Sequence, residues 1–247
     1  MQQTHYIVGG HPFTVNNMEG EISQILPTME PFKADSIGEA LFTVTIDNSI
    51  IPSWQGKKVG TFPCPSATFE VYKKESGAYQ ILILEGNTPC AFIETDDEYK
   101  NISVTTRGSA EQKGFGANNA MMLIYTICTA QHNTLLVHSS VVENGGKAYM
   151  FLGKSGQGKS THSDMWVKYI NGSTLINDDN PVIRIAEDGT PIAYGSPWSG
   201  KRPIYKNVQY PIGGFAAIEQ EKENSIKQEA IPVAFGILLS SMSTMKF

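Results

Sequence analysis

The chain has 247 residues, of which 40% are hydrophobic and 17% charged, a composition typical of a globular protein with a substantial core. A formal net charge of −5 disfavours broad binding to nucleic acid or to anionic membranes, so we expect neither as a partner. The three cysteines, Cys64, Cys90 and Cys128, are far apart in the chain, which disfavours a zinc site or a disulfide framework.

The two ends of the chain carry no targeting or membrane signal. Residues 1–6 lack a basic region followed by a long apolar core, and the apolar run at 233–239 is too short to cross a bilayer. We therefore expect a cytoplasmic protein.

Residues 1–112 are predicted to form a β-rich N-terminal domain. Runs of β-branched and aromatic residues alternate there with turn signals. The predicted strands are 40–46, 68–72, 79–84, 91–94 and 102–106. The second and third of these should form a hairpin. His5 and His11 are expected to be solvated or to lie in turns, and the acidic residues Glu94, Asp96, Asp97 and Glu98 to form a solvated turn.

A second domain is predicted over 113–247, after a polar, glycine-bearing connection. It should begin with a helix over 116–131, whose apolar residues recur at helical spacing. A strand at 134–142 and another at 147–152 are separated by only a tight turn, so this pair should be antiparallel. Shorter strands should follow, and an apolar helix should begin at Ile231.

Residues 153–160 read GKSGQGKS and fit the phosphate-loop pattern G-x-x-x-x-G-K-[ST] at every fixed position. The run 148–152 before them predicts a buried strand, and 161–170 predicts a helix. Glycines allow successive N–H groups to point at an anion, and a helix N-terminus adds a positive dipole end. The predicted nucleotide-binding residues are Gly153, Lys154, Ser155, Gly156, Gln157, Gly158, Lys159, Ser160 and Thr161.

Lys159 would place a positive charge on the terminal phosphates, and Ser160 would offer a hydroxyl to magnesium. Asp178 and Asp179 follow a predicted strand that can return beside the loop. One carboxylate could hold magnesium while the other accepts a proton from an attacking hydroxyl. The alternative is an Asp-Asp turn capped by its own side chains.

Other residues leave two interpretations open. His138 could contact a phosphate or orient an aspartate, or it could be a core residue. Lys201 and Arg202 could neutralise charge during transfer, or form a solvated basic turn. Trp198 is expected in the core, with stacking on a base as the alternative.

The histidine strand, the loop and the Asp-Asp pair, in that order, resemble the catalytic domain of the HPr kinase/phosphorylase family over about 116–185, and more loosely to 218. The resemblance implies a mixed α/β fold related to phosphoenolpyruvate carboxykinase, in which the phosphate-loop sheet contains antiparallel strands. Here a smaller β-rich region would precede it. The family also implies ATP, magnesium, oligomers and phosphate transfer to a serine of a carrier protein.

By matching position, the resemblance implies His138, Lys159, Asp178 and Asp179 as catalytic residues. Asp178 is favoured as the acid/base, with Asp179 as the alternative for that role. The implied metal ligands are Ser160 and Asp179.

The family's downstream E-[IV]-R-G-x-G signature is missing, and 195–201 occupies about that place without a carboxylate. We therefore expect an ATP- and magnesium-dependent phosphotransferase with a different, unidentified acceptor, either a protein or a small molecule. A nucleotide-sensing module without transfer is the alternative. A carboxykinase-like enzyme for a small organic acid is a third, with Arg184, Lys201 and Arg202 as its available basic residues.

Overall fold

The computed structural model describes residues 1–200 and 202–243. Its contacts divide the chain into two compact units, Met1–Thr129 and a second unit that begins at Ala130. Both are mixed α/β with mostly strands, one built on a nine-stranded and the other on a seven-stranded sheet. The boundary differs from the expected 112/113, because the intervening helix belongs with the first unit.

Unit one is a mixed sheet with the order β3-β1-β2-β4-β9-β8-β7-β6-β5. The strands are β1 (Gln2–Val8), β2 (His11–Asn17), β3 (Lys33–Ala34), β4 (Thr43–Ile46), β5 (Lys57–Pro63), β6 (Thr68–Lys73), β7 (Tyr79–Glu85), β8 (Thr88–Thr95) and β9 (Asn101–Thr106). β4 pairs in parallel with β2 and β9, and the other pairs are antiparallel. The predicted β6–β7 hairpin is confirmed.

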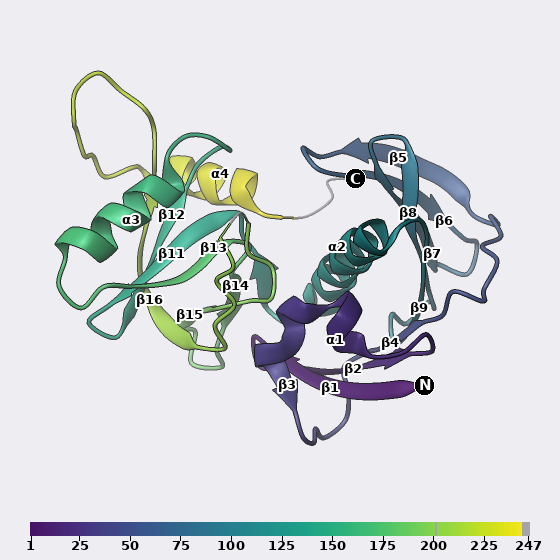
Figure 1. Ribbon diagram of the computed structural model, residues 1–247. Helices are drawn as coiled ribbons and strands as arrows, with labels where there is room; N and C mark the ends of the chain where they lie inside the picture. Colours follow the sequence, from purple (N-terminus) through teal and green to yellow (C-terminus); the bar gives the residue numbers. More distant parts are fainter. Residues whose placement is uncertain (201, 244–247) are drawn as a thin grey trace. The chain divides into compact units, whose positions relative to one another are not determined.

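The helix α2 (Ala110–Thr129) lies across one face of this sheet (Figure 1) and contacts β7, β8 and β9. Small residues at its centre allow a close approach: a Cβ added to Gly116 would lie 2.6 Å from the Cys90 carbonyl oxygen. Tyr125 is fully buried and donates to the Val8 carbonyl over 3.0 Å. This packing explains why α2 folds with the first sheet, although the sequence alone suggested the second. The short helices α1 (Ile22–Ile25) and η1 (Pro27–Phe32) complete the unit.

The N-terminal hairpin β1–β2 was not predicted, because polar residues interrupt its strands. It turns at Gly9 and Gly10, both at positive φ. The expectation that His11 is solvated is wrong: its side chain is buried and packs edge-on against Tyr125. His5 lies on β1, half-buried beside the Thr14 hydroxyl at 3.0 Å.

Unit two is a curled sheet with the order β10-β14-β15-β16-β12-β11-β13. The strands are β10 (Thr134–Leu136), β11 (Ser139–Asn144), β12 (Lys147–Leu152), β13 (Thr174–Asp179), β14 (Val182–Ile185), β15 (Pro191–Tyr194) and β16 (Gln209–Ala217). The predicted antiparallel pair is confirmed as β11–β12. However, the expected single strand 134–142 is interrupted at Val137-His138. Its first part, β10, pairs with β14, whereas its second part, β11, pairs with β12 and β13.

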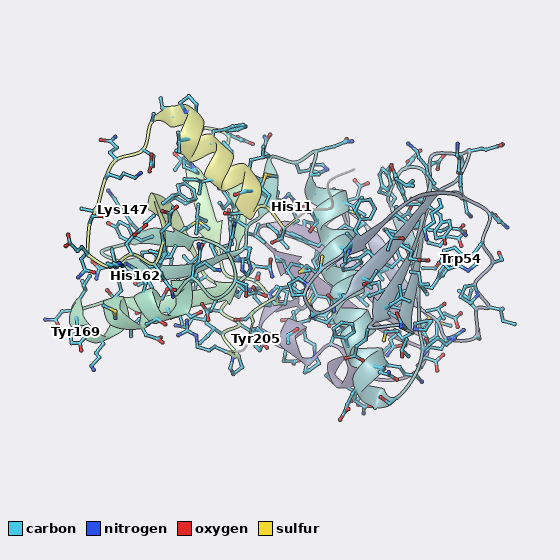
Figure 2. All side chains as sticks on the ribbon, turned by 90° about the horizontal axis from the view of Figure 1, so that it is seen from above. His11, Trp54, Lys147, His162, Tyr169 and Tyr205 are labelled. Carbon is cyan, nitrogen blue, oxygen red and sulfur yellow. The ribbon has the colours of Figure 1, made fainter. Side chains whose placement is uncertain are left out.

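Two helices pack on opposite faces of this sheet. On one face, α3 (Lys159–Tyr169) places Trp166 against Tyr149 and Phe151, and its His162 (labelled in Figure 2) against Phe151. On the other, the predicted C-terminal helix α4 (Ile231–Ser241) packs Ile237 and Leu238 on the buried cluster around Met150. The segment 218–230 between β16 and α4 has no regular structure.

The close contact of α2 with β8 generates a paired prediction. Gly116→Ala should destabilise the protein by about 1–3 kcal/mol, because the methyl group must push α2 away from the Cys90 carbonyl. Gly114→Ala, in the same helix but with its nearest neighbouring atom at 3.9 Å, should stabilise it by about 0.5–1 kcal/mol through helix propensity. Urea-unfolding midpoints would measure both. Shifts in the same direction would contradict this account of the packing.

Candidate active site

The candidate site lies at one edge of the seven-stranded sheet. Because β11 runs antiparallel to both β12 and β13, the carboxyl ends of β12 and β13 lie beside the amino end of β11. Ser139, the first residue of β11, has Leu152 opposite it on one side and Asp179 on the other. His138, the phosphate loop and the Asp178-Asp179 pair are therefore brought together by strand register.

The phosphate loop has the backbone geometry expected of its glycines. Gly153, Gly156 and Gly158 have φ of 147°, 84° and 99°, and α3 begins directly after Gly158. The Lys154 N–H donates to the Gln157 side-chain oxygen over 2.6 Å. The N–H groups of Ser155, Gly156 and Gly158 donate to no partner within the described residues. These donors and the start of α3 make the loop suited to an anion.

Lys159 is 8% exposed and folds back onto the loop. Its ammonium group contacts the carbonyl oxygens of Gly153 at 2.8 Å and Lys154 at 3.2 Å, and His138 Nε2 at 2.9 Å. Burial lowers the pKa of Lys159, and the charges of Asp179 and Asp178 oppose this shift. The lysine therefore occupies, inside the loop, the position from which it could bind a phosphate.

His138 joins Lys159 to Asp179. Its Nδ1 lies 2.8 Å from Asp179 Oδ1, and its Nε2 faces the Lys159 ammonium group. Because a charged ammonium group can only donate, Nε2 accepts, and the neutral ring carries its proton on Nδ1 and donates it to Asp179. His138 is thus placed to orient an aspartate, one of the two roles considered for it.

Asp178 belongs to a second chain of contacts. Ser160 Oγ donates to Asp178 Oδ1 over 3.0 Å, and Arg202 Nε donates to Oδ2 over 2.6 Å. Arg202 also forms an ion pair with Asp164 of α3. Burial favours the neutral carboxyl, but hydrogen bonds from Arg202, Ser140 and Ser160 outweigh it and lower the pKa of Asp178. Asp178, rather than Asp179, is therefore the carboxylate beside Ser160.

A buried polar network holds the loop that carries Arg202. Asn177 is fully buried, and its amide donates to the Ser196 hydroxyl over 3.2 Å. Ser196 in turn donates to the Asn180 carbonyl over 2.6 Å. Trp198 is 2% exposed, as expected for a core residue. Lys201 lies outside the described residues, and Arg184 lies on β14, three strands from β12 in the sheet order.

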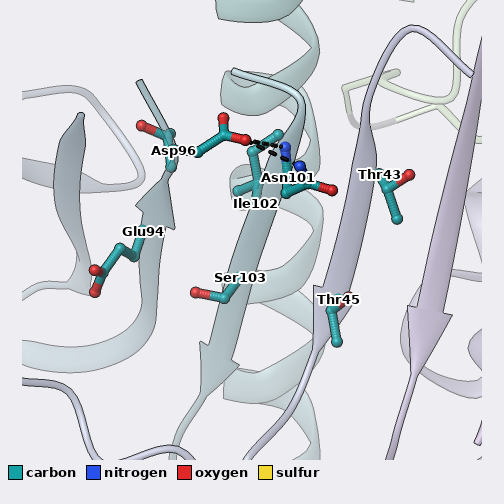
Figure 3. A pocket seen from close by; sticks show the side chains of 8 residues that line it. Thr43, Thr45, Glu94, Asp96, Asn101, Ile102 and Ser103 are labelled. Carbon is teal, nitrogen blue, oxygen red and sulfur yellow. Dashed lines mark hydrogen bonds between the residues drawn. The ribbon is translucent and has the colours of Figure 1, made fainter. Parts of the chain in front are cut away.

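Unit one contains an open hollow of about 330 Å³, on the face of its sheet away from α2 (Figure 3). Thr43, Thr45 and Ser103 line it with Glu94 and Asp96. Asp96 accepts from two N–H groups of its own turn, and Glu94 is paired with Lys74, so both carboxylates are engaged. Among the residues that the structure describes, no group of three or more His, Cys, Asp or Glu could hold a metal ion.

Comparison with known proteins adds no assignment: no family model matches the chain, and no curated protein matches it. In the described part of the chain, every helix is too short or too polar to span a bilayer.

Sequence reasoning did not find the site contacts of three residues, Arg202, Ser140 and Gln220. Arg202 binds Asp178 across 24 positions, Ser140 binds both Ser163 and Asp178, and Gln220 donates to the Gly156 carbonyl over 3.4 Å. No local spacing signals these contacts, because each joins residues more than 20 positions apart in the chain. Only the basic character of 201–202 offered a sequence signal, and it fitted a solvated turn equally well.

The lowered pKa of Asp178 predicts a pH-dependent stability. A carboxylate with a lowered folded-state pKa stabilises the fold fully above its unfolded pKa of about 4, and this contribution is lost as the pH falls through the folded-state value. The difference in unfolding free energy between wild type and Asp178→Asn should therefore be largest above about pH 5 and shrink below about pH 4. Urea titrations across this range would measure it. Asp97→Asn, in an exposed turn, is the control and should give a small, flat difference; a flat difference for Asp178→Asn would contradict the assignment.

Proposed function

We propose that the chain is an ATP- and magnesium-dependent phosphotransferase that transfers the terminal phosphoryl group to a hydroxyl of an unidentified protein or small molecule. The observation that carries the proposal is the convergence of four elements at one sheet edge: the phosphate loop, Lys159, the Ser160–Asp178 pair and the His138–Asp179 pair. The finer fold assignment, a phosphate-loop sheet of the HPr kinase and phosphoenolpyruvate carboxykinase type, is part of this proposal.

The loop and Lys159 would bind the phosphates. Three loop N–H groups are without partners in the described residues, and the lysine donates to neutral carbonyl oxygens. Phosphate oxygens are charged acceptors, and hydrogen bonds to charged groups are roughly twice as strong as neutral ones. Lys159 would therefore exchange its carbonyl partners for a phosphate when nucleotide binds.

Ser160 and Asp178 fit a magnesium ion. They offer a hydroxyl and a carboxylate 3.0 Å apart, and magnesium is usually bound by one or two protein oxygens together with substrate phosphates and water. When bound there, the ion would neutralise charge on the phosphates. This exchanges the roles expected from the sequence, because Asp178 becomes the metal ligand and Asp179 the candidate base.

Asp179 is the better placed proton acceptor. His138 donates to its Oδ1 and orients it, while its Oδ2 has no hydrogen-bond partner within residues 1–200 and 202–243. Asp179 would take the proton of the acceptor hydroxyl as that oxygen bonds to the terminal phosphorus and the bond to the ADP oxygen breaks. Asp178 is less suited to this step, since both its oxygens already accept hydrogen bonds.

A nucleotide-sensing module is the second candidate. It is favoured by the ion pair between Arg202 and Asp178, which already neutralises the proposed metal ligand, and by the missing glutamate signature. In this alternative, nucleotide binding would change the surface around the loop without transfer. A carboxykinase-like activity has less support, because Arg184 lies far from the loop in the strand order. A cytoplasmic location and a homo-oligomeric state stay predictions.

Lys159→Ala should weaken binding of ATP and ADP by about 10- to 100-fold, because a charged hydrogen bond contributes about 1.5–3 kcal/mol. Titration calorimetry in the presence of magnesium would measure the affinities. Lys168→Ala, an exposed lysine near the other end of α3, is the matched control and should bind as wild type does. Equal affinities for wild type and Lys159→Ala would overturn the assignment of the loop.

Asp179→Asn should slow phosphoryl transfer by about 10²- to 10⁴-fold, the usual contribution of a general base, while nucleotide affinity changes only a few-fold. Release of labelled phosphate from ATP to water serves as the assay while the acceptor is unidentified. Asp178→Asn should differ by losing magnesium-dependent binding. Tight binding by the wild type with no release, and no labelling of any acceptor, would favour the sensing module.

A further inference from the structure

The guanidinium group of Arg202 already pairs with Asp178, the carboxylate that the proposed metal cation would bind. Its Nε lies 2.6 Å from Asp178 Oδ2, while Ser160 takes Oδ1. The Asp178 side chain is only 7% exposed, so the carboxylate of this pair is largely shielded from solvent. A divalent cation that binds both Ser160 and Asp178 would therefore meet a positive charge already paired with the carboxylate.

Two features of this arrangement would allow Arg202 to leave Asp178. Its Nη1 pairs with Asp164, which is 64% exposed, so the side chain has a second carboxylate to hold it if it leaves Asp178. Its Nη2 is buried and has no hydrogen-bond partner among the described residues. A buried donor without a partner is unfavourable, so the pair with Asp178 leaves the guanidinium incompletely satisfied.

Backbone groups of Gly200 and Arg202 form hydrogen bonds of their own. The Gly200 N–H donates to the Asp178 carbonyl over 3.1 Å, and a Cβ at Gly200 would lie 3.1 Å from that oxygen. Ser199 Oγ donates to the Arg202 carbonyl over 2.7 Å. The loop therefore keeps Arg202 within reach of both Asp178 and Asp164.

We propose that Arg202 is a counter-cation that competes with magnesium for Asp178 and so sets the magnesium concentration at which nucleotide binds. In the metal-free protein it neutralises the buried carboxylate; when the cation and phosphates arrive, it withdraws to Asp164. The proposal rests on the proposed magnesium–nucleotide site, and it adds Arg202 as a residue that controls the magnesium requirement of that site.

The experiment is an ADP-binding titration at a series of magnesium concentrations, with wild type, Arg202→Gln, Asp164→Asn and the double variant. In Arg202→Gln, the magnesium concentration for half-maximal ADP binding should fall about tenfold. A neighbouring cation weakens the binding of a proton to a carboxylate by about ten- to a thousand-fold, and we expect the lower end of that range for magnesium. In Asp164→Asn it should rise a few-fold, because the displaced guanidinium loses its second partner. The double variant should behave as Arg202→Gln does.

A magnesium requirement that is unchanged or raised in Arg202→Gln would overturn the proposal. Weaker ADP binding at all magnesium concentrations, with the same magnesium midpoint, would instead identify Arg202 as a direct phosphate ligand and also overturn it. If wild type binds no ADP at any magnesium concentration, the proposed function itself fails. Thermal unfolding with magnesium alone then still tests the competition. Arg202→Gln should be stabilised at a lower magnesium concentration than wild type. Equal stabilisation of the two proteins at every magnesium concentration would refute the proposal.

Discussion

The site depends on the backbone pairing of one strand, β11, with an antiparallel neighbour on each side. Ser139 is opposite both Leu152 and Asp179, and Ser140 is opposite both Phe151 and Asp178. A shift of one residue in either ladder would turn every side chain of that strand to the other face. The Ser140 and Asp178 side chains would then no longer face Ser160 and Ser163 of α3. The chemistry proposed for this edge is therefore a consequence of register, and register is protected by the buried residues Val141, Met150 and Ile176 on the opposite face.

The electrostatics of the site follow from the same convergence. Each of the two adjacent carboxylates has its own cationic neighbour: Arg202 pairs with Asp178, and Lys159 reaches Asp179 through His138. Without these cations the two neighbouring carboxylates would repel each other. Both oxygens of Asp178 accept hydrogen bonds, whereas Asp179 Oδ2 has no partner in the part of the chain that the structure describes. Two identical residue types at consecutive positions thereby have different surroundings.

The elements that could be predicted from the sequence are those set by local chemistry. The glycines of the loop, the tight turn between β11 and β12 and the β6–β7 hairpin each depend on residues close together in the chain. The errors concern contacts between distant residues. The burial of His11 depends on Tyr125, more than a hundred positions away, and α2 joins the first sheet because Gly116 fits against Cys90. The assignment of Asp178 to Ser160, and of Asp179 to His138, could not be made either, since alternate residues of a strand point to opposite faces and only the register decides which face meets α3.

The buried polar residues of β13 complete this account. Buried strand positions are usually most stable with apolar side chains, and an unsatisfied buried amide is costly. Asn177 avoids that cost by donating to Ser196 and to the Trp198 carbonyl, and these contacts tie residues 196–198 to the strand end. Gly200 then fits closely against β13, since a Cβ there would lie 3.1 Å from the Asp178 carbonyl oxygen. The polar sequence Asn177-Asp178-Asp179 is thus a poor strand by composition, but it joins the loop of Arg202 to the edge at which Lys159, Ser160 and His138 meet. A local departure from the apolar strand pattern, satisfied by its surroundings, is what a functional site is expected to show.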